Sequence, residues 1–184
     1  MADDYGKFIT LEGSEGVGKT TNIEFVCELL EANKVPFIRT REPGGTPLAE
    51  ALREAMLAVR EEEVSGMTEL LIVFAARTQH LEQVIRPALA LGQWVVCDRF
   101  TDASYAYQGY GRGLNIEHIS ALESWVQNGL QPDLTLLLDL APEVAEQRMQ
   151  ERTKDRMKSE QREFYQRVRA GYLERAARQA RFRI

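Results

Sequence analysis

Residues 13–20 read Gly-Ser-Glu-Gly-Val-Gly-Lys-Thr and match the pattern G-x-x-x-x-G-K-[ST]. A short β-prone run, residues 7–11, leads into them, and apolar side chains at helical spacing follow over residues 20–33. Between a strand and a helix, such glycines let several backbone N–H groups face one anion, and the helix adds the positive end of its dipole. A glycine turn that binds nothing is the alternative, and the flanking strand and helix argue against it. We therefore expect a phosphate-binding loop.

The side chains of this loop suit a nucleoside triphosphate and Mg²⁺. Lys19 is expected to reach the β- and γ-phosphates, and the Thr20 hydroxyl to be a ligand of Mg²⁺. The predicted ATP-binding residues of the loop are Gly13, Ser14, Glu15, Gly16, Val17, Gly18, Lys19, Thr20 and Thr21. GTPases, ATPases and small-metabolite kinases share such loops. A GTPase would carry a guanine-reading N-K-x-D, which is absent from this sequence, and a motor or transporter ATPase usually needs a longer chain.

Strands alternate with helices along the rest of the chain. Further strands are expected over residues 35–40, 94–97, 134–140 and 181–184, and helices over residues 47–59, 68–91 with a kink at Pro87, 115–128 and from 142 onward. Residues 101–113 form a polar, glycine-rich stretch to which the pattern assigns no helix or strand. Strands joined by helices, without hairpin signals, predict an α/β fold of three layers. This P-loop fold would have a parallel sheet of about five strands with helices on both faces.

Three polar segments follow predicted strands: residues 13–20, 41–45 and 98–99. Ligands of parallel α/β sheets bind at the carboxyl ends of the strands. We therefore expect these segments to converge on one site.

Length and composition fit one soluble domain over residues 1–184, with 44% hydrophobic and 28% charged residues. No apolar run is long enough to cross a bilayer, and the acidic start, residues 1–4, lacks the design of a secretion signal, so a cytoplasmic location is expected. Cys27 and Cys97 are expected to be small, buried, reduced residues rather than a disulfide or reactive thiols.

Charge is unevenly distributed. Residues 1–147 hold 11 Lys/Arg and 23 Asp/Glu, net −12, whereas residues 148–184 hold 12 and 5, net +7. The acidic body argues against nucleic-acid binding. The basic segment suits a polyphosphate, and solvated helix faces are the alternative explanation.

Six motifs occur in the order found in thymidylate (dTMP) kinases, the bacterial nucleoside-monophosphate kinase family. They are residues 12–21, Thr-Arg-Glu-Pro-Gly-Gly at 40–45, residues 69–71 with 74–77, residues 98–100, residues 106–109 and residues 132–135. The chain resembles this family from Phe8 to about Arg178. The resemblance implies transfer of the γ-phosphoryl group of ATP to dTMP with Mg²⁺, giving dTDP and ADP for dTTP synthesis, and it implies a homodimer.

The resemblance also implies roles for acceptor-side residues. Phe74 would stack on thymine, Arg77 would donate to a thymine carbonyl, and Ser104 and Gln108 would read the ring nitrogen. Arg99 and Arg53 would bind the dTMP phosphate, Glu15 the sugar 3′-hydroxyl, and Asp98 would lie close to Mg²⁺. The implied dTMP-binding set is Glu15, Glu42, Pro43, Arg53, Phe74, Arg77, Arg99, Ser104, Tyr107 and Gln108.

Several of these residues have simpler readings. Phe74 is also what a helix buries in its core, Arg53 is also an ordinary surface charge, and Tyr105 and Tyr107 can simply pack. One of the two tyrosines blocking a ribose 2′-hydroxyl is a further option.

The branch of the family with an acid in the phosphate loop carries its catalytic arginines in a lid, here residues 150–159. Arg152 is implied as the transition-state arginine beside Lys19 and Arg99, Arg156 as its support, and Arg148 as an adenine contact; solvated charges at a helix end are the alternative. Gln150 replaces an expected arginine and the segment is about one residue short, which predicts a shortened lid or a missing segment. Residues 181–184 look like the start of a further strand, which the family follows with a turn and a last helix; without them, a loop that helps to hold adenine would be absent and a sheet edge bare.

Two other functions stay open on the sequence. One is a P-loop kinase for a different nucleotide or for a nucleoside. The other is a nucleotide-dependent regulatory protein that binds without turnover.

Overall fold

The computed structural model describes residues 5–59, 61–141, 143–145 and 159–184. Its sheet has five parallel strands in the order β2-β3-β1-β4-β5. The strands are β1 (Phe8–Glu12), β2 (Phe37–Arg41), β3 (Trp94–Asp98), β4 (Leu134–Leu137) and β5 (Phe182–Arg183). The predicted parallel α/β sheet is therefore confirmed.

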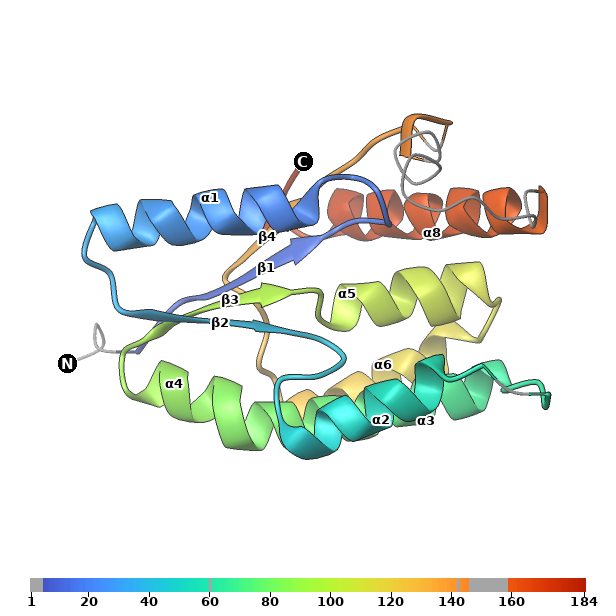
Figure 1. Ribbon diagram of the computed structural model, residues 1–184, viewed down its shortest axis with the longest axis horizontal. Helices are drawn as coiled ribbons and strands as arrows, with labels where there is room; N and C mark the ends of the chain where they lie inside the picture. Colours follow the sequence, from blue (N-terminus) through green and yellow to red (C-terminus); the bar gives the residue numbers. More distant parts are fainter. Residues whose placement is uncertain (1–4, 60, 142, 146–158) are drawn as a thin grey trace.

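All five strands are parallel and therefore end on the same side of the sheet, as Figure 1 shows for β1, β2 and β3. In the register, Asp98 at the end of β3 is opposite both Leu11 of β1 and Arg41 of β2. This pairing places the three polar segments that follow β1, β2 and β3 next to each other, as expected.

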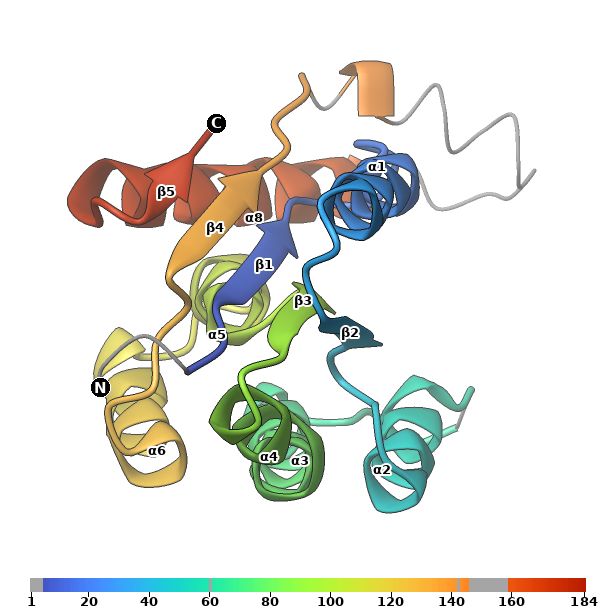
Figure 2. The same ribbon diagram turned by 90° about the vertical axis from the view of Figure 1, so that its left-hand side faces the viewer.

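The helices lie on both faces of the sheet (Figure 2). Helix α1 (Lys19–Ala32) covers one face, where Ile23 and Leu30 pack on alternate residues of β1. The opposite face is covered by α3 (Gly66–His80), the π-helical segment η1 (Leu81–Ile85) and α4 (Arg86–Ala90). Helix α2 (Pro47–Leu57) packs on α3.

The remaining helices complete that opposite layer. They are α5 (Thr101–Ser104), the π-helical segment η2 (Tyr105–Gly111), α6 (Ile116–Gln127) and α8 (Ser159–Arg178). Val168 and Tyr172 of α8 pack with Leu137 of β4 and Phe182 of β5. Helix α8 therefore fixes one edge of the sheet.

Three sequence predictions need correction. The single helix expected over residues 68–91 is divided into α3, η1 and α4, and a π-helical turn precedes Pro87: the N–H of Arg86 donates to the carbonyl of Leu81, five residues back. Strand β4 ends at Leu137 rather than at residue 140.

The polar stretch 101–113 is largely helical, as α5 and η2. Its glycines allow close packing rather than breaking the helix. A Cβ on Gly109 would lie 2.6 Å from Ile116 Cδ1, and one on Gly111 would lie 2.6 Å from Phe164 Cε2. Packing against α6 and α8 thus decides a conformation that composition alone does not predict.

Cys27 lies in α1 and is partly buried, Cys97 is buried in β3, and both are free thiols. None of the described helices combines the length and apolar character needed to cross a membrane.

Candidate active site

The loop between β1 and α1 curls around its own lysine. Gly13, Gly16 and Gly18 have φ values of 138°, 79° and 92°, in a region that L-residues with a side chain rarely adopt. Lys19 Nζ donates to the carbonyls of Gly13 and Ser14, each at 3.0 Å. The loop therefore has the shape that the motif predicts.

Burial and, next, the nearby Arg99 guanidinium lower the pKa of Lys19, which is about 8 after the opposing effects of Asp98 and Glu15. A polyphosphate bound in the loop would place negative charge next to the Lys19 ammonium and favour its charged form. Thr20 and Thr21 are exposed in the first turn of α1, where their hydroxyls are open to a ligand.

Asp98 fits a position near a magnesium ion. Its Oδ1 is buried and has no hydrogen-bond partner within the described part of the chain. Burying a carboxylate oxygen in this way costs free energy of folding unless a cation or a water molecule contacts it. No group of three or more His, Cys, Asp or Glu that could hold a metal is found among the described residues. Mg²⁺ bound through one or two protein oxygens, substrate phosphates and waters fits both observations.

Arg99 follows Asp98 in a left-handed conformation, with φ of 66°. Its Nη2 donates to Glu15 Oε1 at 3.0 Å, and its guanidinium lies 4.7 Å from the centre of the Tyr107 ring. The Tyr107 hydroxyl donates to Glu15 Oε2 at 2.7 Å. Three predicted acceptor-side residues therefore form one contact network, from the phosphate loop, the end of β3 and η2.

Arg53 reaches the same edge of the sheet from α2. Its Nη1 donates to the carbonyl of Pro43 at 3.1 Å. Burial lowers the pKa of Arg53, and the charge of Arg41 and, more weakly, that of Arg99 act in the same direction. An anion bound between these guanidinium groups would relieve their repulsion.

Arg77 is the centre of a second, fully buried cluster. Its Nε donates to Glu42 Oε2 at 2.6 Å, and its Nη2 donates to Ser104 Oγ at 3.1 Å. The guanidinium carbon lies 4.5 Å from the ring centre of Phe74 and 5.1 Å from that of Phe100. The structure thus brings together four residues of the implied dTMP-binding set: Glu42, Phe74, Arg77 and Ser104.

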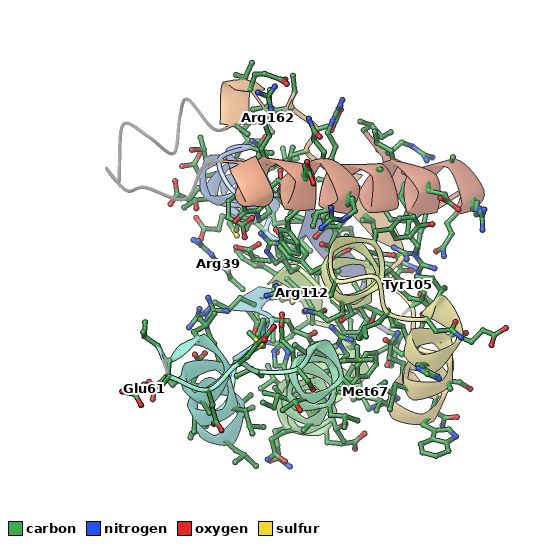
Figure 3. All side chains as sticks on the ribbon, turned by 90° about the vertical axis from the view of Figure 1, so that its right-hand side faces the viewer. Arg39, Glu61, Met67, Tyr105, Arg112 and Arg162 are labelled. Carbon is green, nitrogen blue, oxygen red and sulfur yellow. The ribbon has the colours of Figure 1, made fainter. Side chains whose placement is uncertain are left out.

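Phe74 is 2% exposed and packs in a core cluster with Leu70, Tyr105 and Ile119. Its role as a core residue is thereby observed, and thymine stacking stays a prediction. Gln108 Nε2 donates to Glu69 Oε1 at 3.0 Å, and Glu69 also pairs with Arg112. Figure 3, which faces the side on which the strands end, shows Arg112 near the middle of this view.

Five buried side-chain nitrogen or oxygen atoms have no hydrogen-bond partner among the described residues. Three of these atoms lie in ion pairs: Arg86 Nε, Asp102 Oδ2 and Arg175 Nη2. The other two are Arg77 Nη1 and Asp98 Oδ1. The unused polar atoms therefore coincide with the predicted thymine and magnesium positions.

Sequence reasoning missed several residues of these clusters. His80 donates through Nδ1 to Glu42 Oε1 at 3.1 Å, because a carboxylate can only accept, and its Nε2 lies 2.6 Å from Thr40 Oγ1. Glu69 and Tyr172 accept hydrogen bonds from the predicted residues Gln108 and Arg99, and the buried Glu12 accepts the Tyr172 hydroxyl. Glu12 and Glu69 stand inside the quoted motifs, so a role could have been sought there; Tyr172 had no such signal.

The lid arginines Arg148, Arg152 and Arg156 lie outside the described residues, as does most of the proposed lid over 150–159.

Comparison with known proteins gives one consistent result. The thymidylate kinase family model matches residues 11–184. Thymidylate kinase of Teredinibacter turnerae is 58% identical over 172 residues, covering 93% of this chain and 84% of the relative. That of Chromohalobacter salexigens is 58% identical over 94% of this chain and 82% of its own length. That of Pseudomonas syringae pv. syringae is 57% identical over 97% of this chain and 86% of its own length. With its phosphate loop and acceptor-side clusters, this chain belongs to the thymidylate kinase family.

Proposed function

We propose that this chain transfers the γ-phosphoryl group of ATP to dTMP, giving dTDP and ADP, as a step toward dTTP. Family membership and the names of relatives at 57–58% identity support this reaction. The observation that carries the choice of acceptor is the buried Nη1 of Arg77, which lies next to Phe74 and Ser104 and has no partner in the regions that the structure describes.

On the donor side, residues 13–21 hold the triphosphate through backbone N–H groups. Lys19 neutralises charge on the β- and γ-phosphates, and Thr20 and Asp98 hold Mg²⁺ directly or through its waters. The ion, when bound, offsets negative charge on the phosphate oxygens. Arg152 and Arg156 are proposed to act from the lid over residues 150–159, and Arg148 to lie against adenine.

On the acceptor side, thymine has two carbonyl acceptors and one N3–H donor. Arg77 Nη1 can donate to a carbonyl without giving up its bonds to Glu42 and Ser104. Glu69 can only accept, so it turns the amide nitrogen of Gln108 toward itself and leaves the amide oxygen as an acceptor for N3–H. Phe74 contributes a ring face, with Glu42 and Pro43 at the edge of the pocket.

The acceptor phosphate binds to Arg99 and Arg53, while Glu15 accepts the sugar 3′-hydroxyl and Tyr107 packs beside the sugar. Because the attacking oxygen of dTMP is already anionic, no general base is needed. These residues act by positioning and by charge stabilisation, which supply most of the catalysis in phosphoryl transfer.

A homodimer in the cytoplasm completes the proposal, which includes neither a nucleic acid nor a membrane as a partner. Exposed leucines on the outer helices, Leu48 and Leu57 of α2 and Leu71 of α3, support pairing through this face. Sedimentation of the wild type and of Leu71→Glu would test it: a monomeric wild type would contradict the dimer.

Phosphorylation assays with dTMP, dUMP, AMP, CMP and thymidine test the reaction. We expect dTMP to be the best acceptor. A better rate with AMP, CMP or thymidine would support a different kinase and refute the thymine assignment. Nucleotide binding without turnover on any of these acceptors would support a regulatory protein.

A further inference from the structure

Glu12 and Tyr172 are two buried residues to which the proposed function gives no role. Glu12 is 0% exposed at the end of β1, and Tyr172 is 1% exposed in α8. Glu12 Oε1 accepts the N–H of Phe100 at 2.7 Å, and Oε2 accepts the Tyr172 hydroxyl at 2.8 Å. The carboxyl group therefore ties the phosphate-loop strand to the segment after β3 and to α8.

The segment that Glu12 holds is strained. Arg99 has a φ of 66°, a conformation that costs a residue with a side chain free energy and persists only where surrounding contacts enforce it. The N–H of Arg99 donates to the Leu11 carbonyl at 3.0 Å, and the following N–H, that of Phe100, donates to Glu12. These bonds fix the backbone turn from which the guanidinium projects.

Tyr172 holds the guanidinium itself. Arg99 Nη1 donates to the Tyr172 hydroxyl oxygen at 3.3 Å, while the hydroxyl proton is donated to Glu12. The opposite nitrogen, Nη2, is held by Glu15 at 3.0 Å. Both ends of the guanidinium are therefore anchored, one by the phosphate loop and the other by α8.

The Tyr172 side chain has little freedom to leave this position. Its ring packs edge-on to Tyr107, with centroids 6.3 Å apart and an interplanar angle of 81°. The preceding residue, Gly171, lies so close to the Tyr110 ring that a Cβ there would be 2.8 Å from it. Close packing of α8 on η2 thus sets where the hydroxyl stands.

We propose that Tyr172 is a positioning residue for the acceptor phosphate: its hydroxyl, oriented by Glu12, holds the Arg99 guanidinium in the geometry that binds dTMP. The inference rests on the proposed function, in which Arg99 contacts that phosphate. Tyr172 acts through Arg99 and does not itself touch the substrate. Helix α8 is in this way part of the acceptor site.

The test is Tyr172→Phe, which removes one oxygen and keeps the ring. We expect the KM for dTMP to rise about 10- to 150-fold, as for loss of one hydrogen bond to a charged group, and the KM for ATP to stay within about twofold. Tyr110→Phe is the matched control, since its hydroxyl makes no contact with Arg99 among the described residues, and it should change neither KM.

A double-mutant cycle with Arg99→Lys separates positioning from general loosening. Because Lys cannot span both anchors, Tyr172→Phe should have little further effect on the dTMP KM in that background. An undiminished effect there, or an equal rise of both KM values in the single variant, would overturn the inference. If Tyr172→Phe does not fold, Glu12→Gln serves instead, and we again expect the KM for dTMP to rise while the KM for ATP does not. An unchanged ratio of the dTMP KM to the ATP KM in Glu12→Gln would refute the inference. A wild type that does not phosphorylate dTMP would refute the proposed function itself.

Discussion

The burial of Glu12 makes a quantitative prediction about stability. Burial and, next, the neighbouring Asp102 charge raise the pKa of this carboxyl from 4.5 to about 8. The group is fully buried, so solvent screening does not reduce the effect. In the unfolded chain the carboxyl has an ordinary pKa and ionises near pH 4.5.

The sign follows from linkage. Below pH 4.5 both states hold the proton, and the stabilising effect of the raised pKa is fully present. Between pH 4.5 and about 8 only the folded state keeps it, so the free energy of unfolding falls as pH rises, by about 1.4 kcal/mol per pH unit. The total loss from this one group is of the order of 5 kcal/mol, reached once the pH exceeds about 8.

Glu12→Gln should remove that slope. Gln retains an oxygen that can accept the Phe100 N–H but does not titrate. Urea unfolding of both proteins at pH 5, 6, 7 and 8 measures the difference, and the wild type should lose about 3 kcal/mol relative to the variant between pH 5 and 8. Glu28→Gln, on the exposed side of α1, controls for the loss of one carboxylate. Parallel pH profiles for wild type and Glu12→Gln would refute the reasoning.

Three further variants test other parts of the structure. Gly45→Ala places a Cβ 2.5 Å from the His80 imidazole at a φ of 85°, and it should lower the free energy of unfolding in urea by about 2–4 kcal/mol. The control Gly113→Ala, with a φ of 75° and open space around the new Cβ, should lower it by about 1–2 kcal/mol. Equal losses in the two variants would argue against the clash. Asp102→Asn leaves Arg175 and Arg181 without their buried carboxylate and should lower the free energy of unfolding by about 3–5 kcal/mol. Glu174→Gln, which removes the more exposed pair with Arg178, should lower it by less than about 1 kcal/mol. Lys19→Met should reduce kcat at least about 100-fold in a coupled ADP assay while thermal melting shows a folded protein; retained turnover would exclude its phosphate role.

Much of the fold was predictable because its signals are local. The glycines of residues 13–20 and the strand and helix around them lie within one short stretch, and the loop has the expected form. Strand ends were less predictable: β4 ends at Leu137 although the apolar run continues, since apolar character marks burial and not hydrogen bonding. The helical η2 was missed because its glycines serve close packing against α6 and α8.

The sequence by itself determined that this chain has a phosphate loop, a parallel α/β sheet and the motifs of the thymidylate kinase family, since each is encoded by neighbouring residues or by regular spacing. Only the tertiary structure decided which side chains meet. Tyr172 and Glu12 are 160 residues apart in sequence, yet they share a hydrogen bond beside Arg99. Spacing tells which face of a helix is buried, but the partner found there depends on how distant elements pack. This packing also determines which buried polar atoms, such as Arg77 Nη1 and Asp98 Oδ1, find no partner among the residues that the structure describes.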